Sequence, residues 1–308
     1  MTVSLQTARL DKQSRAVCGT HQGGMTLDQL RIHTPNTLSE AWALKAKDPA
    51  GTLWLSGTTW LRTQWEAGQL KKQKQWIRLD GIPELTSGIR RDETTLRISA
   101  LTPFGAIGRC HDTAVCAPLL KQAIHEIAAP SIREQATLGG NVATGCGDSI
   151  PALLASGTSV LVHTEGRDEE WPLEDWLQAG LPGLIVDISI PVHGNEKDLA
   201  VYVKTGRREA FIPSAATFAI TGSFDRDTYS FRTFLAAAGG GTMIPVRLES
   251  LERFLMKTPL TSNAVFKRMA DEVRKDYRPE DDPFLSGAYK QQIVCNQMIQ
   301  NIHSTLGR

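Results

Sequence analysis

The glycine-rich stretch at residues 132–154 constrains this chain more than any other part of its sequence. It reads IREQATLGGNVATGCGDSIPALL, with four glycines among small polar residues and an apolar segment directly after them. Because glycine has no Cβ, backbone N–H groups in such a stretch can approach a bulky ligand closely. Thr137 and Asn141 add short polar side chains, and Asp148 stands where it would cap a helix predicted at about 149–156. The stretch fits an extended phosphate-containing cofactor, and it equally fits a plain turn before a helix.

A second stretch of this kind follows a short apolar strand. The segment TLWLS ends in the loop Ser56-Gly57-Thr58-Thr59, and WLRTQWE comes next as a helical or irregular segment. A strand that ends in a loop of small residues can direct backbone N–H groups at an anion. Taken alone, the pattern is also compatible with a simple turn.

Composition narrows the class of protein. The net charge is +1, from 34 basic and 33 acidic residues without a basic block, which argues against nucleic-acid binding. No stretch approaches the roughly 18 uninterrupted apolar residues that span a bilayer, and the chain begins without the apolar run of a secretory signal. The cysteines are an odd, scattered set of five, which favours reduced thiols and a cytoplasmic location.

The 308 residues are enough for two domains, and the pattern predicts an α+β protein in two parts. The polar segment 193–197 interrupts the periodicity and marks the predicted boundary between them. The predicted units are a flexible leader at 1–24, a first domain at 25–192 with subdomains at about 25–82 and 83–192, and a C-terminal α+β domain at 195–308.

Individual elements follow from capping residues and periodicity. Thr37 and Glu40 form a capping box at the start of an amphipathic helix. Alternating apolar residues predict strands, and longer apolar faces predict helices. The predicted strands lie at 75–80, 96–101, 158–164 and 183–191, and the predicted helices at 117–129, 246–256, 260–276 and 284–304, the last three after an antiparallel sheet.

Four motifs in a fixed order make this chain resemble a known family. They are ATLGGN at 136–141 with Asp148 and PALL at 151–154, the loop at 56–59, YVKTGR at 202–207, and GGTMIPVR at 240–247. Together they resemble the FAD-binding (medium) subunit of molybdenum hydroxylases, the group of xanthine dehydrogenase and carbon monoxide dehydrogenase. The resemblance covers nearly everything from about residue 30 to residue 302.

The resemblance implies a two-subdomain FAD-binding fold of the PCMH type, followed by an antiparallel sheet and a helical bundle. It also implies non-covalent FAD that takes electrons from an iron–sulfur small subunit and passes them to NAD⁺ or another acceptor. The molybdenum cofactor would reside on a third, large subunit, where the substrate is hydroxylated. No metal ligand and no catalytic side chain is expected in this chain, because the cofactor carries the redox chemistry.

The implied FAD contacts come from five places in the sequence. Residues 55–61 and 137–141 would surround the pyrophosphate, Asp148 would accept from a ribityl or ribose hydroxyl, Ile185 would pack on the ring face, and Lys204 would lie near the pyrimidine end. Two roles stay open for Arg207 and Arg208: contact with the flavin phosphate, or contact with a partner surface. The implied set is Leu55, Ser56, Gly57, Thr58, Thr59, Trp60, Leu61, Thr137, Gly139, Gly140, Asn141, Asp148, Ile185 and Lys204.

Departures from the family pattern keep two other functions open. Thr58 stands where the family has a second glycine, Trp60 stands where an acid is common, and the segment between Asn141 and Asp148 is about two residues short. The alternatives are a free-standing flavin oxidase of the same fold and an interaction subunit that has lost FAD. Cys110 and Cys116 alone are too few for the four thiolates of an iron–sulfur cluster, so none is predicted in this chain.

Overall fold

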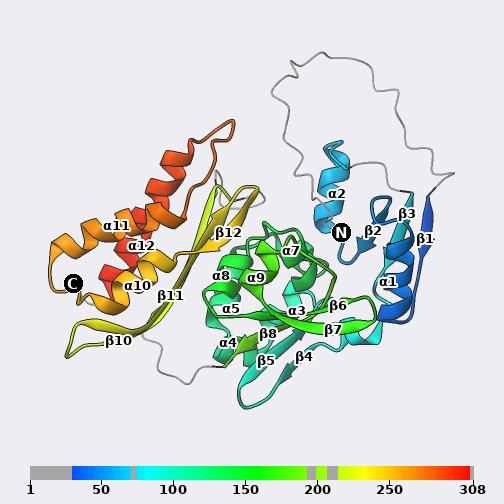
Figure 1. Cartoon of the computed structure of the whole chain (residues 1–308), viewed down its shortest axis with the longest axis horizontal. Helices are drawn as coiled ribbons and strands as arrows, with labels where there is room; N and C mark the ends of the chain where they lie inside the picture. The colour runs from blue at the N-terminus through cyan, green and yellow to red at the C-terminus, as the bar shows by residue number, and fades with distance from the viewer. Residues whose placement is uncertain (1–29, 71–73, 193–198, 207–213, 306–308) are drawn as a thin grey trace.

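The computed structural model describes residues 30–70, 74–192, 199–206 and 214–305 (Figure 1). The predicted leader, the predicted boundary at 193–197, Arg207 and Arg208 lie outside the described residues. Within the described residues, none of the helices combines the length and the apolar character needed to cross a membrane.

The first described unit is a small parallel sheet in the order β1-β3-β2. Its strands are joined by crossover helices, as parallel strands require. Thr37 accepts the backbone N–H of Glu40 at 3.2 Å, and this confirms the predicted N-terminal cap of the first helix. The elements are β1 (Arg31–His33), α1 (Leu38–Lys47), β2 (Thr52–Leu55), α2 (Thr59–Glu66) and β3 (Gln75–Arg78).

The second unit is a five-stranded antiparallel sheet in the order β4-β5-β8-β6-β7, with short helices packed against it. One continuous hydrophobic core joins it to the first unit, because Ile77 of β3 and Leu38 of α1 share that core with Ile98 of β5. The strands are β4 (Ile89–Arg91), β5 (Thr95–Ser99), β6 (Ser159–Thr164), β7 (Arg167–Pro172) and β8 (Leu184–Pro191). The helices are the 3₁₀ helix η2 (Pro83–Thr86), α3 (Phe104–Arg109), α4 (His111–Cys116), α5 (Pro118–Glu126), α6 (Pro130–Arg133), α7 (Leu138–Ala143), α8 (Ile150–Leu154) and α9 (Leu173–Gln178).

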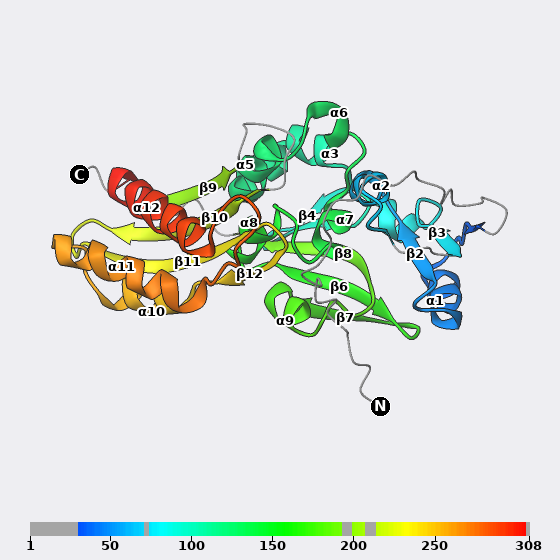
Figure 2. The ribbon, with the colours of Figure 1, turned by 90° about the horizontal axis from the view of Figure 1, so that it is seen from above.

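The C-terminal unit is a four-stranded antiparallel sheet, ordered β12-β11-β10-β9, with three long helices. Alternate residues of its central strand β10 face opposite sides: Phe218 belongs to a separate C-terminal core, whereas Ala219 belongs to the core of the preceding units. The sheet therefore lies between helices α10 to α12 on one side and α5 and α8 on the other (Figures 1 and 2). The elements are β9 (Leu199–Thr205), β10 (Ala216–Asp225), β11 (Ser230–Gly240), β12 (Met243–Arg247), α10 (Glu249–Lys257), α11 (Asn263–Asp276) and α12 (Gly287–Thr305).

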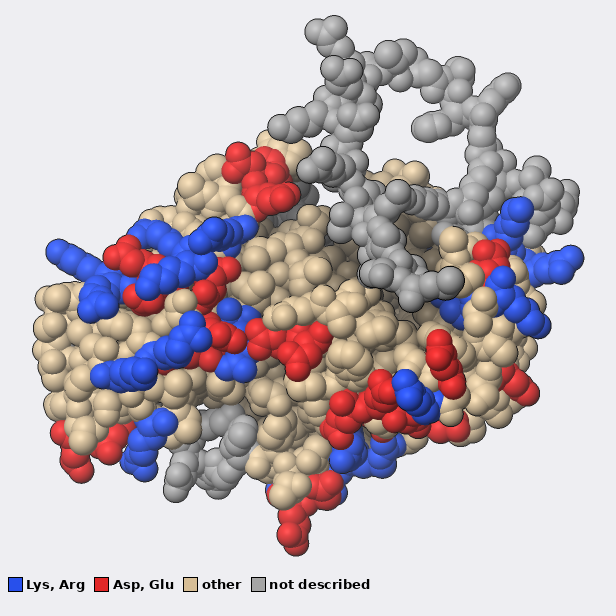
Figure 3. Space-filling model, in the orientation of Figure 1, with Lys and Arg blue, Asp and Glu red and all other residues tan. Residues whose placement is uncertain are grey.

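The outer face of the C-terminal helices carries both signs of charge side by side (Figure 3). Arg253 pairs with Glu249 at 2.8 Å, and Arg274 pairs with Asp271 at 3.0 Å. These side chains are exposed, and exposed pairs of this kind contribute about 0–1 kcal/mol each.

Two local predictions differ from the structure. The ATLGGN segment, for which the sequence predicts a loop, contains the start of the six-residue helix α7. The Thr137 hydroxyl accepts the Gly140 N–H and starts this helix despite two adjacent glycines. Asp148 was expected to be the N-cap of the next helix, and this is wrong. That position belongs to Ser149, while the Asp148 carboxylate is held by residues of the C-terminal unit.

Candidate functional site

The two glycine-bearing segments singled out from the sequence meet in space. The hydroxyls of Ser56 and Thr137, 81 residues apart in the chain, are hydrogen-bonded at 2.5 Å. The contact extends to the backbone, since a Cβ added to Gly57 would lie 1.9 Å from the carbonyl oxygen of Gln135. Glycine at 57 is therefore a requirement of this junction.

Two helices begin at this junction. Helix α2 starts at Thr59 and α7 starts at Leu138, and the first N–H groups of any helix have no acceptor within the helix. Helix starts also carry partial positive charge, so anions are favoured there. A Cβ on Gly140 would lie 2.8 Å from the Thr137 hydroxyl oxygen and 3.3 Å from that of Ser56. The first three N–H groups of α7 already donate within the protein, to the Thr102 carbonyl, the Ala100 carbonyl and the Thr137 hydroxyl. The donors that remain for a pyrophosphate are therefore those at the start of α2, which lies beside the side-chain-free Gly140.

Thr58, one of the departures from the family pattern, adopts a left-handed conformation with φ 56° as the residue before α2. A β-branched residue is strained there because its Cβ crowds the backbone, whereas glycine is not. The structure thus gives a physical reason for a glycine at this position, and Thr58 adopts the conformation with backbone strain.

Asp148 lies at the other end of the site and is held by three groups. Lys204 of β9 pairs with its carboxylate at 2.9 Å, and Ser214 donates to the other carboxylate oxygen at 2.5 Å. The Tyr202 hydroxyl donates to the Asp148 backbone carbonyl at 2.8 Å. Lys204 also donates to the Glu126 carbonyl at 3.3 Å, so its ammonium has two partners within the protein.

Asn141 connects Asp148 to the glycine-bearing junction. Its side-chain oxygen accepts the Ser149 N–H at 3.2 Å and the Ser149 hydroxyl at 2.6 Å. Gly147 is pressed against Asn141, because a Cβ there would lie 2.3 Å from both the carbonyl and the side-chain oxygen of Asn141. One continuous set of contacts therefore runs from the loop at residue 56 to Lys204.

Comparison with known proteins agrees with this geometry. Residues 28–193, more than half of the chain, match the family described as FAD binding domain in molybdopterin dehydrogenase. The chain belongs to this family. It is therefore an FAD-binding subunit of the molybdenum hydroxylases, which are oxidoreductases, as the motifs predicted.

Two named relatives cover most of the chain. The xanthine dehydrogenase FAD-binding subunit of Escherichia coli O157:H7 is 22% identical over 277 residues, which covers 87% of this chain and 92% of that protein. The 6-hydroxypseudooxynicotine dehydrogenase complex subunit alpha of Paenarthrobacter nicotinovorans is 24% identical over 242 residues, covering 75% and 79%.

The fold also matches solved structures. A chain of carbon monoxide dehydrogenase from Hydrogenophaga pseudoflava superposes with a TM-score of 0.82 at 20% identity, covering 91% of this chain and 98% of that chain. This confirms the predicted α+β class, with parallel and antiparallel sheets followed by C-terminal helices.

The other predicted FAD contacts of this subunit differ in how much surface they offer. Trp60 is 40% exposed on α2, whereas Ile185 on β8 is only 5% exposed within the main core, which leaves little of it to pack on a ring. The Thr137 hydroxyl already caps α7 and bonds Ser56, so within the protein it serves as a structural group. Nearby, burial raises the pKa of the Cys146 thiol, which disfavours the reactive thiolate.

The sequence did not reveal the residues that hold the predicted site residues in place. Ser149 orients Asn141, Gln135 packs on Gly57, and Ser214 fixes Asp148. Ser149 directly follows Asp148 and could have been suspected, but Ser214 is 66 residues away and stands in no motif.

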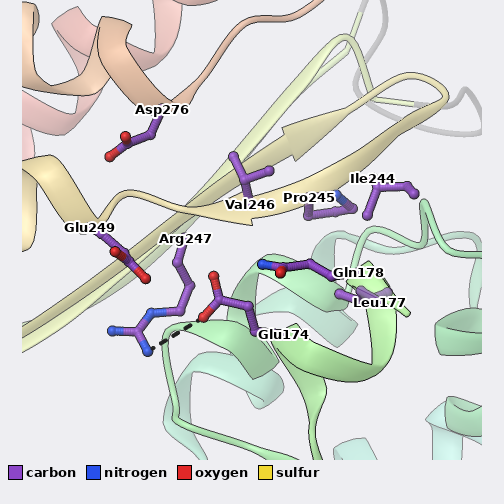
Figure 4. A pocket seen from close by; sticks show the side chains of 9 residues that line it. All are labelled: Glu174, Leu177, Gln178, Ile244, Pro245, Val246, Arg247, Glu249 and Asp276. Atoms are coloured by element: carbon purple, nitrogen blue, oxygen red, sulfur yellow. Dashed lines mark ion pairs between the residues drawn. The ribbon is translucent and has the colours of Figure 1, made fainter. Parts of the chain in front are cut away.

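A separate hollow opens between α9 and the C-terminal unit (Figure 4). Arg247 and Glu174 approach across it at 3.8 Å. None of the predicted FAD contacts lines it, so it is distinct from the candidate site. Its lining is Glu174, Leu177, Gln178, Ile244, Pro245, Val246, Arg247, Glu249 and Asp276.

Proposed function

We propose that this FAD-binding subunit is the electron-transfer flavoprotein of a three-component molybdenum hydroxylase. Bound FAD would supply the redox chemistry, taking electrons from iron–sulfur clusters of a small subunit and passing them to NAD⁺ or another acceptor. A large subunit with the molybdenum cofactor would hydroxylate the substrate. Relatives named as subunits of dehydrogenase complexes support this assignment, and the scattered cysteines favour a cytoplasmic location.

The observation that carries the proposal is the junction between residues 56 and 137. It places the start of α2, whose first N–H groups have no acceptor within the helix, next to a glycine of α7 that presents no side chain, Gly140. A dinucleotide pyrophosphate, with its two negative charges, suits such a surface.

Each predicted contact has a role in this proposal. Residues 55–61, including Leu55 and Leu61, hold the pyrophosphate with backbone groups, and residues 137–141, including Gly139, border it on the other side. Asp148 accepts from a ribityl or ribose hydroxyl, and the ring lies against the small exposed part of Ile185. Lys204, paired with Asp148 at 2.9 Å, lies near the pyrimidine end, where a cation favours reduced flavin.

The loop is tested by placing a branched side chain in it. In Gly140→Val, the new Cβ would lie 2.8 Å from the Thr137 hydroxyl oxygen, so both the cap of α7 and the space beside it are lost. The purified variant should retain little flavin absorbance. Ala143→Val is the matched control, because it adds a branched side chain at an exposed position of the same helix and should keep full flavin content. Full flavin occupancy in Gly140→Val would show that the loop does not face FAD.

The partners are tested by purification of the native assembly. Copurification with an iron–sulfur chain and a molybdenum-containing chain, detected by metal analysis, would support the three-component assignment. A flavin-containing protein that purifies alone and reduces its flavin with a small substrate would instead identify a free-standing oxidase.

A further inference from the structure

The site of this subunit extends beyond the domain that the family match covers. The matched segment ends at residue 193, but the three groups that hold Asp148 come from residues 202, 204 and 214. Both carboxylate oxygens and the backbone carbonyl of Asp148 are thus engaged by the C-terminal unit. These contacts restrict both the side chain and the backbone of that loop, and they leave each carboxylate oxygen able to accept a further hydrogen bond.

Strand β9, which carries Tyr202 and Lys204, is itself positioned by the FAD-binding domain. It is an edge strand with a free side, and Gln122 of α5 fills that side: it donates to the Ala200 carbonyl at 3.0 Å and accepts the Tyr202 N–H at 2.9 Å. One amide side chain therefore makes two of the backbone hydrogen bonds that a further strand would make at this edge. Lys204 then meets the last turn of α5 at the Glu126 carbonyl, where a cation is favoured by the helix dipole.

The hydroxyls of Tyr202 and Ser214 have little access to water, so Asp148 is their main hydrogen-bond partner. Both residues are almost fully buried, at 6% and 2% exposure. Burial, followed by the nearby charges of Asp148 and Glu126, raises the pKa of Tyr202 well above its usual range, so its hydroxyl keeps the proton that it donates. The Asp148 side chain is 18% exposed, so water replaces a lost donor only in part.

We propose that Ser214 and Tyr202 are positioning residues for FAD: through Asp148 they fix the loop at 146–149 and set how far the Asp148 charge offsets that of Lys204. This inference rests on the proposed flavin-binding function. Ser214 disperses negative charge on Asp148, which leaves more of the Lys204 charge available to reduced flavin. Tyr202 holds the loop backbone and, through Ser149 and Asn141, the end of α7.

The test compares variants of the full chain that each lose one hydroxyl. Ser214→Ala should raise the dissociation constant of FAD about tenfold, the effect of losing about 1.4 kcal/mol, which lies near the lower end for a hydrogen bond to a charged group. It should also move the midpoint potential of bound FAD to more negative values. Tyr202→Phe should weaken FAD binding about fivefold, as expected for a neutral bond, with a smaller change in potential.

Thr205→Val is the matched control. Thr205 lies on the same strand next to Lys204, but its hydroxyl bonds Gln297 of α12 at 3.1 Å and does not contact Asp148. This variant should bind FAD with unchanged affinity and potential. If Ser214→Ala and Tyr202→Phe both match Thr205→Val in affinity and potential, the inference is overturned while the proposed function stands. If the unaltered chain binds no FAD, the proposed function itself fails.

Discussion

Arg247, the last residue of the GGTMIPVR motif, neutralises a carboxylate buried between β11, β12 and α10. Glu252 is 5% exposed, and it accepts Arg247 Nε at 3.2 Å, a second guanidinium hydrogen bond, and the Ala236 N–H at 2.9 Å. Arg247→Met removes the positive charge but keeps an apolar side chain of similar reach. Glu252 is then left as a buried charge with a single backbone donor.

The expected cost follows from that unpaired charge. Breaking a buried ion pair by removing one partner destabilises by about 3–5 kcal/mol, a large part of the roughly 5–15 kcal/mol of a typical domain. The double variant Arg247→Met/Glu252→Gln removes the charge and keeps an acceptor for the Ala236 N–H, so it should recover part of the loss. Arg253→Ala is the control, because its pair with Glu249 is exposed, and it should cost less than about 1 kcal/mol.

Urea unfolding followed by far-UV circular dichroism measures these differences in the free energy of unfolding. Dichroism is needed because all seven tryptophans lie between residues 42 and 176, outside the C-terminal unit. A loss in Arg247→Met no larger than that in Arg253→Ala would refute the reasoning. A double variant that is less stable than Arg247→Met would also refute it, because it would show that the unpaired Glu252 charge does not cause the loss of stability.

Two further predictions concern backbone strain and acid stability. Thr58→Gly should raise the free energy of unfolding by up to about 1 kcal/mol, because relief of the left-handed strain exceeds the entropy that glycine adds to the unfolded chain. A lower urea midpoint for Thr58→Gly would contradict this. The Lys290 ammonium, with two backbone N–H groups, lowers the pKa of Asp282 to about 2. The stabilisation from this carboxylate is therefore complete above about pH 4 and lost as pH falls through about 2. Asp282→Asn should lower stability at neutral pH and reduce the acid-induced loss in that window, so unchanged stability profiles from pH 2 to 7 would disprove the linkage.

The sequence predicts those parts of the fold that local chemistry specifies. The cap at Thr37 and the alternation that predicts β3 and β5 each depend on neighbouring residues. Strand β7 was missed because RDEEWP carries no apolar alternation; its pairing with β6 at the sheet edge determines it. Helix α7 was missed for a related reason: glycine propensity argues against it, and a Thr137 cap together with tertiary contacts decides otherwise.

The role of Asp148 shows where such reasoning ends. A residue before an apolar run is a good N-cap candidate by local pattern, but three donors from the C-terminal unit draw this carboxylate and its backbone carbonyl away from the helix. Those donors lie more than 50 residues away in the chain, so the residues around Asp148 do not predict them. The same contacts mean that the candidate site belongs to both parts of the chain: one end depends on the junction of Ser56 with Thr137, and the other depends on β9 being held by Gln122. The C-terminal unit therefore contributes contacts to the candidate site, although the family match ends before it.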